Sequence, residues 1–214
     1  MELDHIFFFV KDTSAAERLA ASLGLTETYR RKHPGQGTAN ICYCFENAFL
    51  ELLYVTDEAE VKTSCIERTG LYERSEWRSL GTSPLGISWR LRPDEEEEGF
   101  ETWSFNPPYM PSGIGIEVSV DGDDFNQPMM FRSPGRTAPI EWPLDRRGNL
   151  QYAAGMKKIS KVIVRHPNHF RPRDCLSHLA NRLPIELRES EGKTWNLSIV
   201  IETMDEQHRT LRVL

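Results

Sequence analysis

The pattern of hydrophobic and polar positions is clearest in the first 56 residues. Residues 6–10 form a continuous apolar run, IFFFV, which predicts a short buried strand. Residues 15–23 have alanine-rich, amphipathic spacing and are followed by Gly24, which predicts a helix that ends at a glycine. Three further strands are predicted at residues 26–32, 39–45 and 48–55. The order of elements is therefore strand, helix, strand, strand, strand.

The same order returns near the end of the chain. Residues 159–164 are an apolar strand, and residues 175–183 have helical spacing. Three strand candidates follow at residues 185–188, 195–201 and 210–214. We therefore divide the chain into a first βαβββ unit (1–56), a middle segment of linker helices and irregular strands (57–154) and a second βαβββ-like unit (155–214).

This pattern predicts an α+β fold. Repeated βαβββ units would form a cupped, mostly antiparallel sheet. Because the pattern occurs at both ends of the chain, we expect the first and last units to present curved sheets to a shared cavity.

Composition and charge exclude several classes of protein. The chain has 214 residues, with 26 Lys and Arg against 32 Asp and Glu, so its net charge is −6. This acidic balance argues against a nucleic-acid coat protein, and no apolar run approaches the roughly 18 residues of a membrane span. The first residues lack a secretory signal, and the four cysteines lack the spacing of a zinc site. We expect a cytoplasmic protein with reduced thiols and neither a nucleic-acid nor a membrane partner.

Two side chains stand out as candidates for chemistry. His5 opens the first strand, and Glu51 is the only charged residue between Ala48 and Val55. Both faces of this last strand are apolar, so the strand is predicted to be covered on both sides. A buried or cleft-lining Glu51 is favoured over a solvated one.

These residues resemble the vicinal oxygen chelate superfamily. The first strand reads D-H-I-x-x-x-V from Asp4, and the last strand of the unit reads L-E-L-x-x-V around Glu51. Residues 33–40 read H-P-G-x-G-T-x-N, which is similar to a loop of glyoxalase-like domain proteins. The resemblance is specific over residues 3–56, looser over 155–214 and weak between them.

The resemblance implies a small-molecule site with a divalent metal, which would be Fe, Mn, Ni or Zn. His5 and Glu51 match two metal ligands of the family, and the metal would act as a Lewis acid on a substrate oxygen. His33 would be a nearby base, and Asn40 a substrate contact. Related folds often complete their cavities across subunits, so a homodimer is compatible with the resemblance.

The sequence departs from the family pattern at the other two ligands. The strand predicted from Leu85 has Gly86 or Ser88 where a histidine belongs, and Glu117 or Glu141 are the candidates for the second carboxylate. His5 and Glu51 are therefore either metal ligands or a hydrogen-bonded structural pair. Correspondingly, the protein is a metal-assisted enzyme acting on a small oxygen-bearing molecule, or a metal-free binding protein of the bleomycin-resistance type. A scaffold that binds a protein partner is a third interpretation.

The middle segment contains an aromatic stretch, WSFNPPYMP, at residues 103–111. Trp103 and Tyr109 are candidates for lining an apolar substrate pocket. The alternative is that these rings and prolines only anchor a long loop on the sheet.

Overall fold

The computed structural model describes residues 1–96, 99–192 and 194–213, and its strands form two sheets. The larger has eight strands in the order β2-β3-β4-β1-β5-β8-β7-β6, and the smaller has the order β10-β9-β11-β12. The strands of the first sheet are β1 (Glu2–Phe9), β2 (Tyr29–His33), β3 (Thr38–Cys44), β4 (Phe49–Val55), β5 (Leu85–Arg90), β6 (Thr102–Phe105), β7 (Ile116–Ser119) and β8 (Met129–Arg132). Those of the second are β9 (Met156–His166), β10 (Ile185–Glu189), β11 (Asn196–Thr203) and β12 (His208–Arg212).

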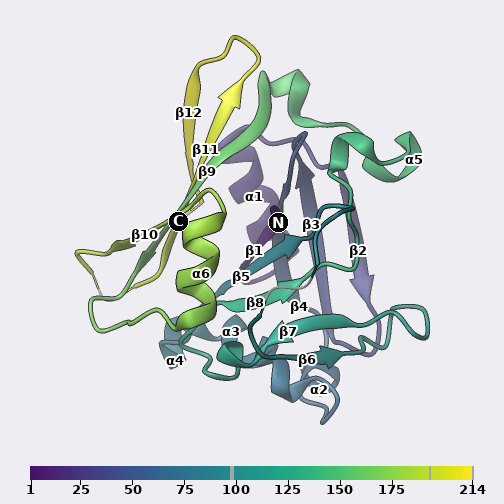
Figure 1. The fold of residues 1–214 in the computed structure, drawn as a ribbon, viewed down its shortest axis with the longest axis vertical. Helices are drawn as coiled ribbons and strands as arrows, with labels where there is room; N and C mark the ends of the chain where they lie inside the picture. The colour runs from purple at the N-terminus through teal and green to yellow at the C-terminus, as the bar shows by residue number, and fades with distance from the viewer. Residues whose placement is uncertain (97–98, 193, 214) are drawn as a thin grey trace.

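The helices pack around these sheets (Figure 1). They are α1 (Thr13–Leu23), α2 (Glu58–Val61), α3 (Leu71–Ser75), α4 (Trp77–Leu80), α5 (Leu144–Arg147) and α6 (Asp174–Arg182). Helix α1 packs against β3 and β4, and α6 packs against β10. Among the described residues, no helix combines the length and apolar character needed to cross a bilayer.

The predicted α+β fold is confirmed, and the first unit has the predicted order of elements. The apolar run enters β1, and α1 ends at Gly24, whose φ of 72° is the left-handed conformation that glycine adopts readily. The last predicted strand is β12, although its final residue, Leu214, lies outside the described residues.

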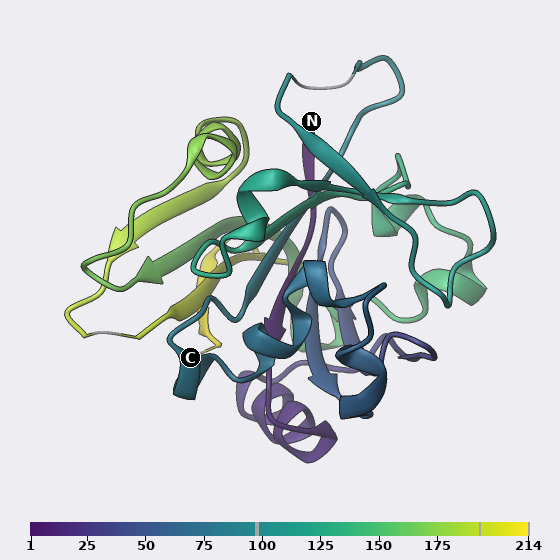
Figure 2. The ribbon, with the colours of Figure 1, turned by 90° about the horizontal axis from the view of Figure 1, so that it is seen from below.

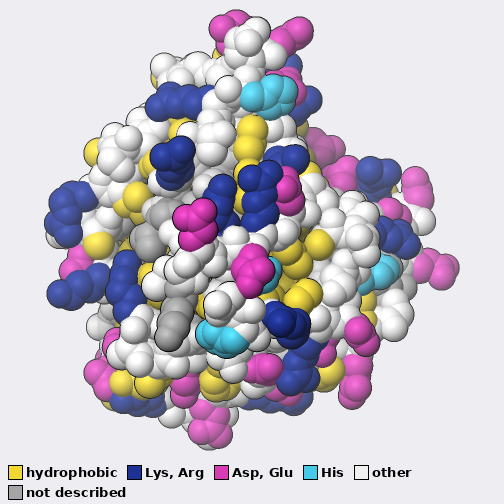
Figure 3. Space-filling view, turned by 90° about the vertical axis from the view of Figure 1, so that its left-hand side faces the viewer, with side chains coloured by type: hydrophobic (Ala, Val, Ile, Leu, Met, Phe, Trp, Pro, Cys, Tyr) yellow, Lys and Arg dark blue, Asp and Glu magenta, His cyan; other side chains and the backbone are white. Residues whose placement is uncertain are grey.

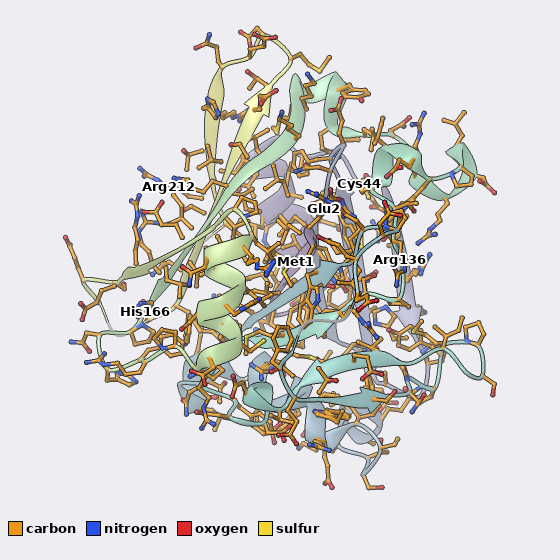
Figure 4. All side chains as sticks on the ribbon, viewed as in Figure 1. Met1, Glu2, Cys44, Arg136, His166 and Arg212 are labelled. Atoms are coloured by element: carbon orange, nitrogen blue, oxygen red, sulfur yellow. The ribbon has the colours of Figure 1, made fainter. Side chains whose placement is uncertain are left out.

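The two halves of the large sheet come from the first unit and the middle segment. β1 pairs parallel with β4, β5 pairs parallel with β8, and β1 and β5 meet antiparallel at the centre. The four-stranded sheet lies beside this sheet (Figures 1 and 2). In Figure 4, the labelled His166 and Arg212 of the small sheet lie on the opposite side of the view from Cys44 and Arg136.

The expectation that the first and last units share a cavity is therefore wrong. Both edges of β1 are occupied, by β4 and β5, so the middle segment completes the sheet. The last unit has the same element order as the first but pairs differently, because β9 lies between β10 and β11. A pattern of elements does not specify which strand edges meet.

Strand β1 contains an extra residue at Asp4. Leu3 pairs with Trp89 and His5 with Ser88, so two steps along β1 match only one step along β5. This is a β-bulge, which re-aims side chains at the point where it occurs. On a regular strand Asp4 and His5 would point to opposite faces, whereas here both side chains line the same cavity.

A glycine makes the close approach of β1 and β5 possible. Gly86 pairs with Phe7, and a Cβ atom at Gly86 would lie 2.0 Å from Cε1 of the Phe7 ring. The Phe7 ring is buried and lines the cavity. Gly86 is therefore required to keep this ring in place.

We predict that Gly86→Ala destabilises the protein by about 1–3 kcal/mol, because the Phe7 ring must move out of a packed position. Urea unfolding followed by circular dichroism measures this free energy. Gly99→Ala is the matched control, since a Cβ at Gly99 meets nothing within 4 Å. Equal stability of the two variants would contradict the steric account, and Phe7→Leu should restore part of the loss in the Gly86→Ala background.

Candidate functional site

A cavity of about 320 Å³ opens on the face of the large sheet. It is lined by side chains from both halves of this sheet and from the loops that follow β6 and β8. Of the described residues that line it, none belongs to the four-stranded sheet. Most of its wall is apolar, with Phe49, Phe105, Met129, Phe131 and Trp142 among its members, and its polar groups gather at β1 to β4.

His5 is held in one orientation at the polar end of the cavity. Its Nδ1 lies 2.7 Å from Oδ2 of Asp4, a buried carboxylate. Its ring stacks on Phe49, with centroids 4.3 Å apart, and meets the edge of Phe131. Because a carboxylate only accepts hydrogen bonds, Nδ1 carries the proton, and Nε2 is the nitrogen directed at Glu51.

Glu51 is the second group at this end of the cavity. Its Oε2 lies 3.5 Å from Nε2 of His5, and its Oε1 accepts a hydrogen bond of 2.7 Å from Nδ2 of Asn40. If neither Nε2 nor Oε2 carried a proton, two lone pairs would face each other. The geometry therefore suits a proton, or a hydroxyl of a ligand, between His5 and Glu51.

His33 supports Asn40 at the far end of the same chain of contacts. Nδ2 of Asn40 lies 3.4 Å from Nε2 of His33, and Nδ1 of His33 lies 2.8 Å from Oγ1 of Thr38. Since the Asn40 amide donates, Nε2 accepts, and Nδ1 donates to Thr38. Burial lowers the pKa of His33 and outweighs the opposite influence of Glu51.

The resulting polar chain runs Asp4–His5–Glu51–Asn40–His33. All five side chains are buried, and all five line the cavity. The chain collects the predicted site residues His5, His33, Asn40 and Glu51 in one place.

Of the two aromatic candidates, only one reaches the cavity. The Tyr109 ring stacks on His33 with centroids 4.5 Å apart and lines the cavity. The indole of Trp103 instead lies beneath the Arg68 guanidinium, 4.4 Å from the ring centroid, and Trp103 is not part of the lining. Trp103 lies in strand β6, outside the cavity lining, and its role as a substrate contact stays a prediction.

Comparisons with known proteins agree with this fold. Residues 3–112, about half of the chain, match the family described as "Glyoxalase-like domain". The chain belongs to the glyoxalase-like domain family. The predicted resemblance to the vicinal oxygen chelate superfamily is thereby confirmed. A search of curated proteins finds no match to the sequence.

Similar solved structures are distant in sequence. A methylmalonyl-CoA epimerase in complex with methylmalonyl-CoA and NH4+ is 17% identical, with a TM-score of 0.40, over 64% of this chain and 97% of its own. A hypothetical protein from Bacillus halodurans C-125 is 17% identical, with a TM-score of 0.42, over 61% and 91%. A hypothetical protein from Staphylococcus aureus is 14% identical, with a TM-score of 0.45, over 99% and 85%.

The second half of the sheet in this glyoxalase-like protein supplies no counterpart to His5 and Glu51. Of the two β5 candidates for a further ligand, Gly86 pairs with Phe7 and has no side chain, and Ser88 pairs with His5 but is not part of the cavity lining. The β8 residues that line the cavity, Met129 and Phe131, are apolar. The other carboxylates considered are elsewhere, because Glu117 accepts from Thr102 and Glu141 accepts from the Ala138 amide.

The residues present therefore fit only half of a family-type metal site. His5 and Glu51 converge as two ligands would, and Asp4 orients His5 as carboxylates orient metal-bound histidines. However, the described residues contain no group of three or more His, Cys, Asp or Glu side chains that could hold an ion. Two side chains do not make the three- or four-ligand set of a tightly held metal.

Sequence reasoning missed Asp4 and Thr38 as parts of the site. Asp4 lies next to His5 in the D-H motif, and on a regular strand it would point to the other face. Thr38 lies within the H-P-G-x-G-T-x-N segment. Its hydroxyl reaches the His33 ring because the turn between β2 and β3 pairs these two residues. Only the folded register brings these partners together.

We predict that His33 makes the protein less stable below neutral pH. The pKa of His33 is lower in the folded protein than in the unfolded chain, so the unfolded chain binds a proton more readily. The contribution of neutral His33 to the free energy of unfolding is therefore complete above about pH 6.5 and is lost as the pH falls toward the folded pKa. This loss is at most about 1.4 kcal/mol per pH unit for one group. Urea unfolding at pH 7, 6 and 5 measures it.

The matched variants are His33→Gln and His169→Gln, the latter changing an exposed histidine outside the cavity. His33→Gln should flatten the pH dependence, and His169→Gln should leave it as in the wild type. An unchanged slope in His33→Gln would contradict the assignment of a neutral His33.

Proposed function

We propose that this glyoxalase-like protein is an enzyme that moves a proton within a small, largely apolar molecule bearing a carbonyl or hydroxyl oxygen. The observation that carries the proposal is the polar chain, which places Nε2 of His5 and Oε2 of Glu51 3.5 Å apart in the wall of one largely apolar cavity. A paired acid and base in an apolar site is typical of general acid–base catalysis. The family and the fold alone would not decide between an enzyme and a binding protein.

The two groups divide the reaction between them. The Glu51 carboxylate removes a proton from a carbon next to the carbonyl, and the C–H bonding pair forms the enol double bond. His5, protonated on Nε2, donates its proton to the carbonyl oxygen. Glu51 then returns a proton to the enol carbon while His5 Nε2 takes back the hydroxyl proton. Exchange of the Glu51 proton with solvent before this return makes the net change a hydrogen exchange, and return of the proton to another carbon of the conjugated system makes it an isomerisation.

The remaining members of the polar chain position these two groups. Asp4 accepts from Nδ1 of His5 and stabilises the imidazolium. Asn40 holds one oxygen of Glu51 and leaves the other facing the ligand, and His33 supports Asn40. The apolar wall excludes water, which strengthens the electrostatic interactions inside. His33 thus acts through Asn40, rather than as the base that the sequence suggested.

A metal-free binding protein is the second candidate function. The apolar wall favours it, since a ligand without an acidic C–H bond would be held in the cavity and remain unchanged. Metal binding at His5 and Glu51 stays a prediction, and the proton transfer described above uses only side chains of this chain.

We predict that the protein accelerates exchange of the C1 hydrogens of 2-tetralone for deuterium in D2O, measured by proton NMR. This ketone is small and mostly apolar, and its C1 hydrogens are acidic. Glu51→Gln and His5→Gln should each lower the enzymatic rate by about 100-fold or more, because each removes one proton-transfer group. Glu76→Gln, on an exposed residue outside the cavity, should have no effect.

Exchange that is equal in wild type and Glu51→Gln would contradict the proposal. Saturable binding of 2-tetralone with no exchange would support the binding protein instead.

We predict that tag-free protein holds Fe, Mn, Ni or Zn only weakly, because two side-chain ligands are available. Mass spectrometry after dialysis against a chelator should find far less than one metal ion per chain, and the exchange activity should survive the dialysis. Stoichiometric metal that is lost in both His5→Ala and Glu51→Ala would show instead that the pair is a metal site, as the family resemblance implies.

A further inference from the structure

The ligand's chemical class is indicated by the mouth of the cavity. We infer that the cavity binds an aromatic carboxylic acid of one or two rings, with its carboxylate at the mouth that Arg31 and Arg146 line and its ring against the aromatic wall. The inference rests on the proposed function, because it assigns the ligand of the same cavity. Its evidence, however, comes from residues outside the polar chain.

The aromatic wall is formed by Tyr29, Phe49 and Trp142. The Tyr29 and Phe49 centroids are 6.4 Å apart, and those of Phe49 and Trp142 are 5.8 Å apart. Phe49 also stacks on His5. The three rings therefore form one surface that leads from the mouth of the cavity to the polar chain, and such a surface suits a planar ligand.

Two of the three rings each carry a guanidinium. The Arg31 Cζ atom lies 5.2 Å from the centroid of Tyr29, and that of Arg146 lies 4.3 Å from the centroid of Trp142. Both arginines are exposed residues that line the cavity. Contact with the rings limits their movement, so their positive charges stay at the mouth.

These two charges lack an internal partner. Neither Arg31 nor Arg146 makes an ion pair with any other described residue. The neighbouring Arg30, whose side chain points to the other face of β2, instead pairs with Glu17 and Glu27. On the side of the four-stranded sheet, seen in Figure 3, basic and acidic side chains are interspersed. Two unpaired guanidiniums over one cavity therefore indicate an anionic ligand.

The charges inside the cavity fix the direction of the ligand. Glu51 and Asp4 are buried at the polar end of the cavity, where they would repel the carboxylate of a ligand. A carboxylate at the mouth, near the positive charges of Arg31 and Arg146, avoids this repulsion and directs the ring along Phe49 toward His5. The cavity of about 320 Å³ encloses one or two rings and little more.

The test compares 2-naphthoate with 2-naphthamide, two ligands of equal shape that differ in charge. Isothermal titration calorimetry of the wild type should give a dissociation constant for the acid at least about 10-fold lower than for the amide, since hydrogen bonds to charged groups are stronger. Added salt should weaken the binding of the acid and leave the binding of the amide unchanged.

The variants locate the charge that makes this difference. Arg31→Gln and Arg146→Gln should each reduce the preference for the acid, and the double variant should abolish it with the affinity for the amide unchanged. Arg18→Gln on α1 is the matched control, because it removes an exposed arginine that does not line the cavity. It should preserve the preference fully.

Equal binding of acid and amide, binding of neither, or a preference that survives in the double variant would each overturn the inference. Displacement of 2-naphthoate by inorganic phosphate at a similar concentration would show that the site binds anions without requiring an aromatic ring, and would overturn that part of the inference. If the wild type does not exchange 2-tetralone hydrogens but still prefers the acid in an arginine-dependent way, the proposed reaction is wrong and the inferred ligand class is supported.

Discussion

The site depends on one extra residue in the central strand. Because Asp4 forms a bulge between Leu3 and His5, two consecutive side chains reach the same cavity, and the carboxylate can accept from the imidazole at 2.7 Å. Arg90, buried beside the bulge, donates to the Leu3 carbonyl and lies 3.5 Å from the second oxygen of Asp4. A regular strand would place Asp4 on the opposite face, and His5 would lose the partner that fixes its ring.

The two halves of the large sheet contribute differently to the cavity. The first half supplies the polar chain, whereas Gly86 and Phe131 of the second half supply space and apolar surface. Gly86 admits the Phe7 ring, and Phe131 packs on the edge of His5. The cavity therefore has a polar end, supplied by the first half, and an apolar wall to which both halves contribute. This arrangement supports the proposed transfer of a proton by side chains.

Local patterns predicted the first unit well, because its strands and helix are specified by residues close together in sequence. The lone charge in an apolar strand also located Glu51, and the family motif located His5, His33 and Asn40. The partner of β1 and the direction of Asp4 could not be predicted, since both depend on pairing with β5, more than 80 residues away. The surroundings of Trp103 could not be predicted for a similar reason, because β6 lies at the edge of the sheet, where the indole meets Arg68.

The central claim is that Asp4–His5–Glu51–Asn40–His33 forms one connected chain in which each histidine carries a proton on Nδ1. Long-range proton–nitrogen NMR correlation spectra of the histidine rings test this claim directly. The account predicts a protonated Nδ1 in both His5 and His33, with Nε2 of His33 unprotonated and accepting from Asn40. Spectra showing an unprotonated Nδ1 in His5, or a proton on Nε2 alone in His33, would contradict it.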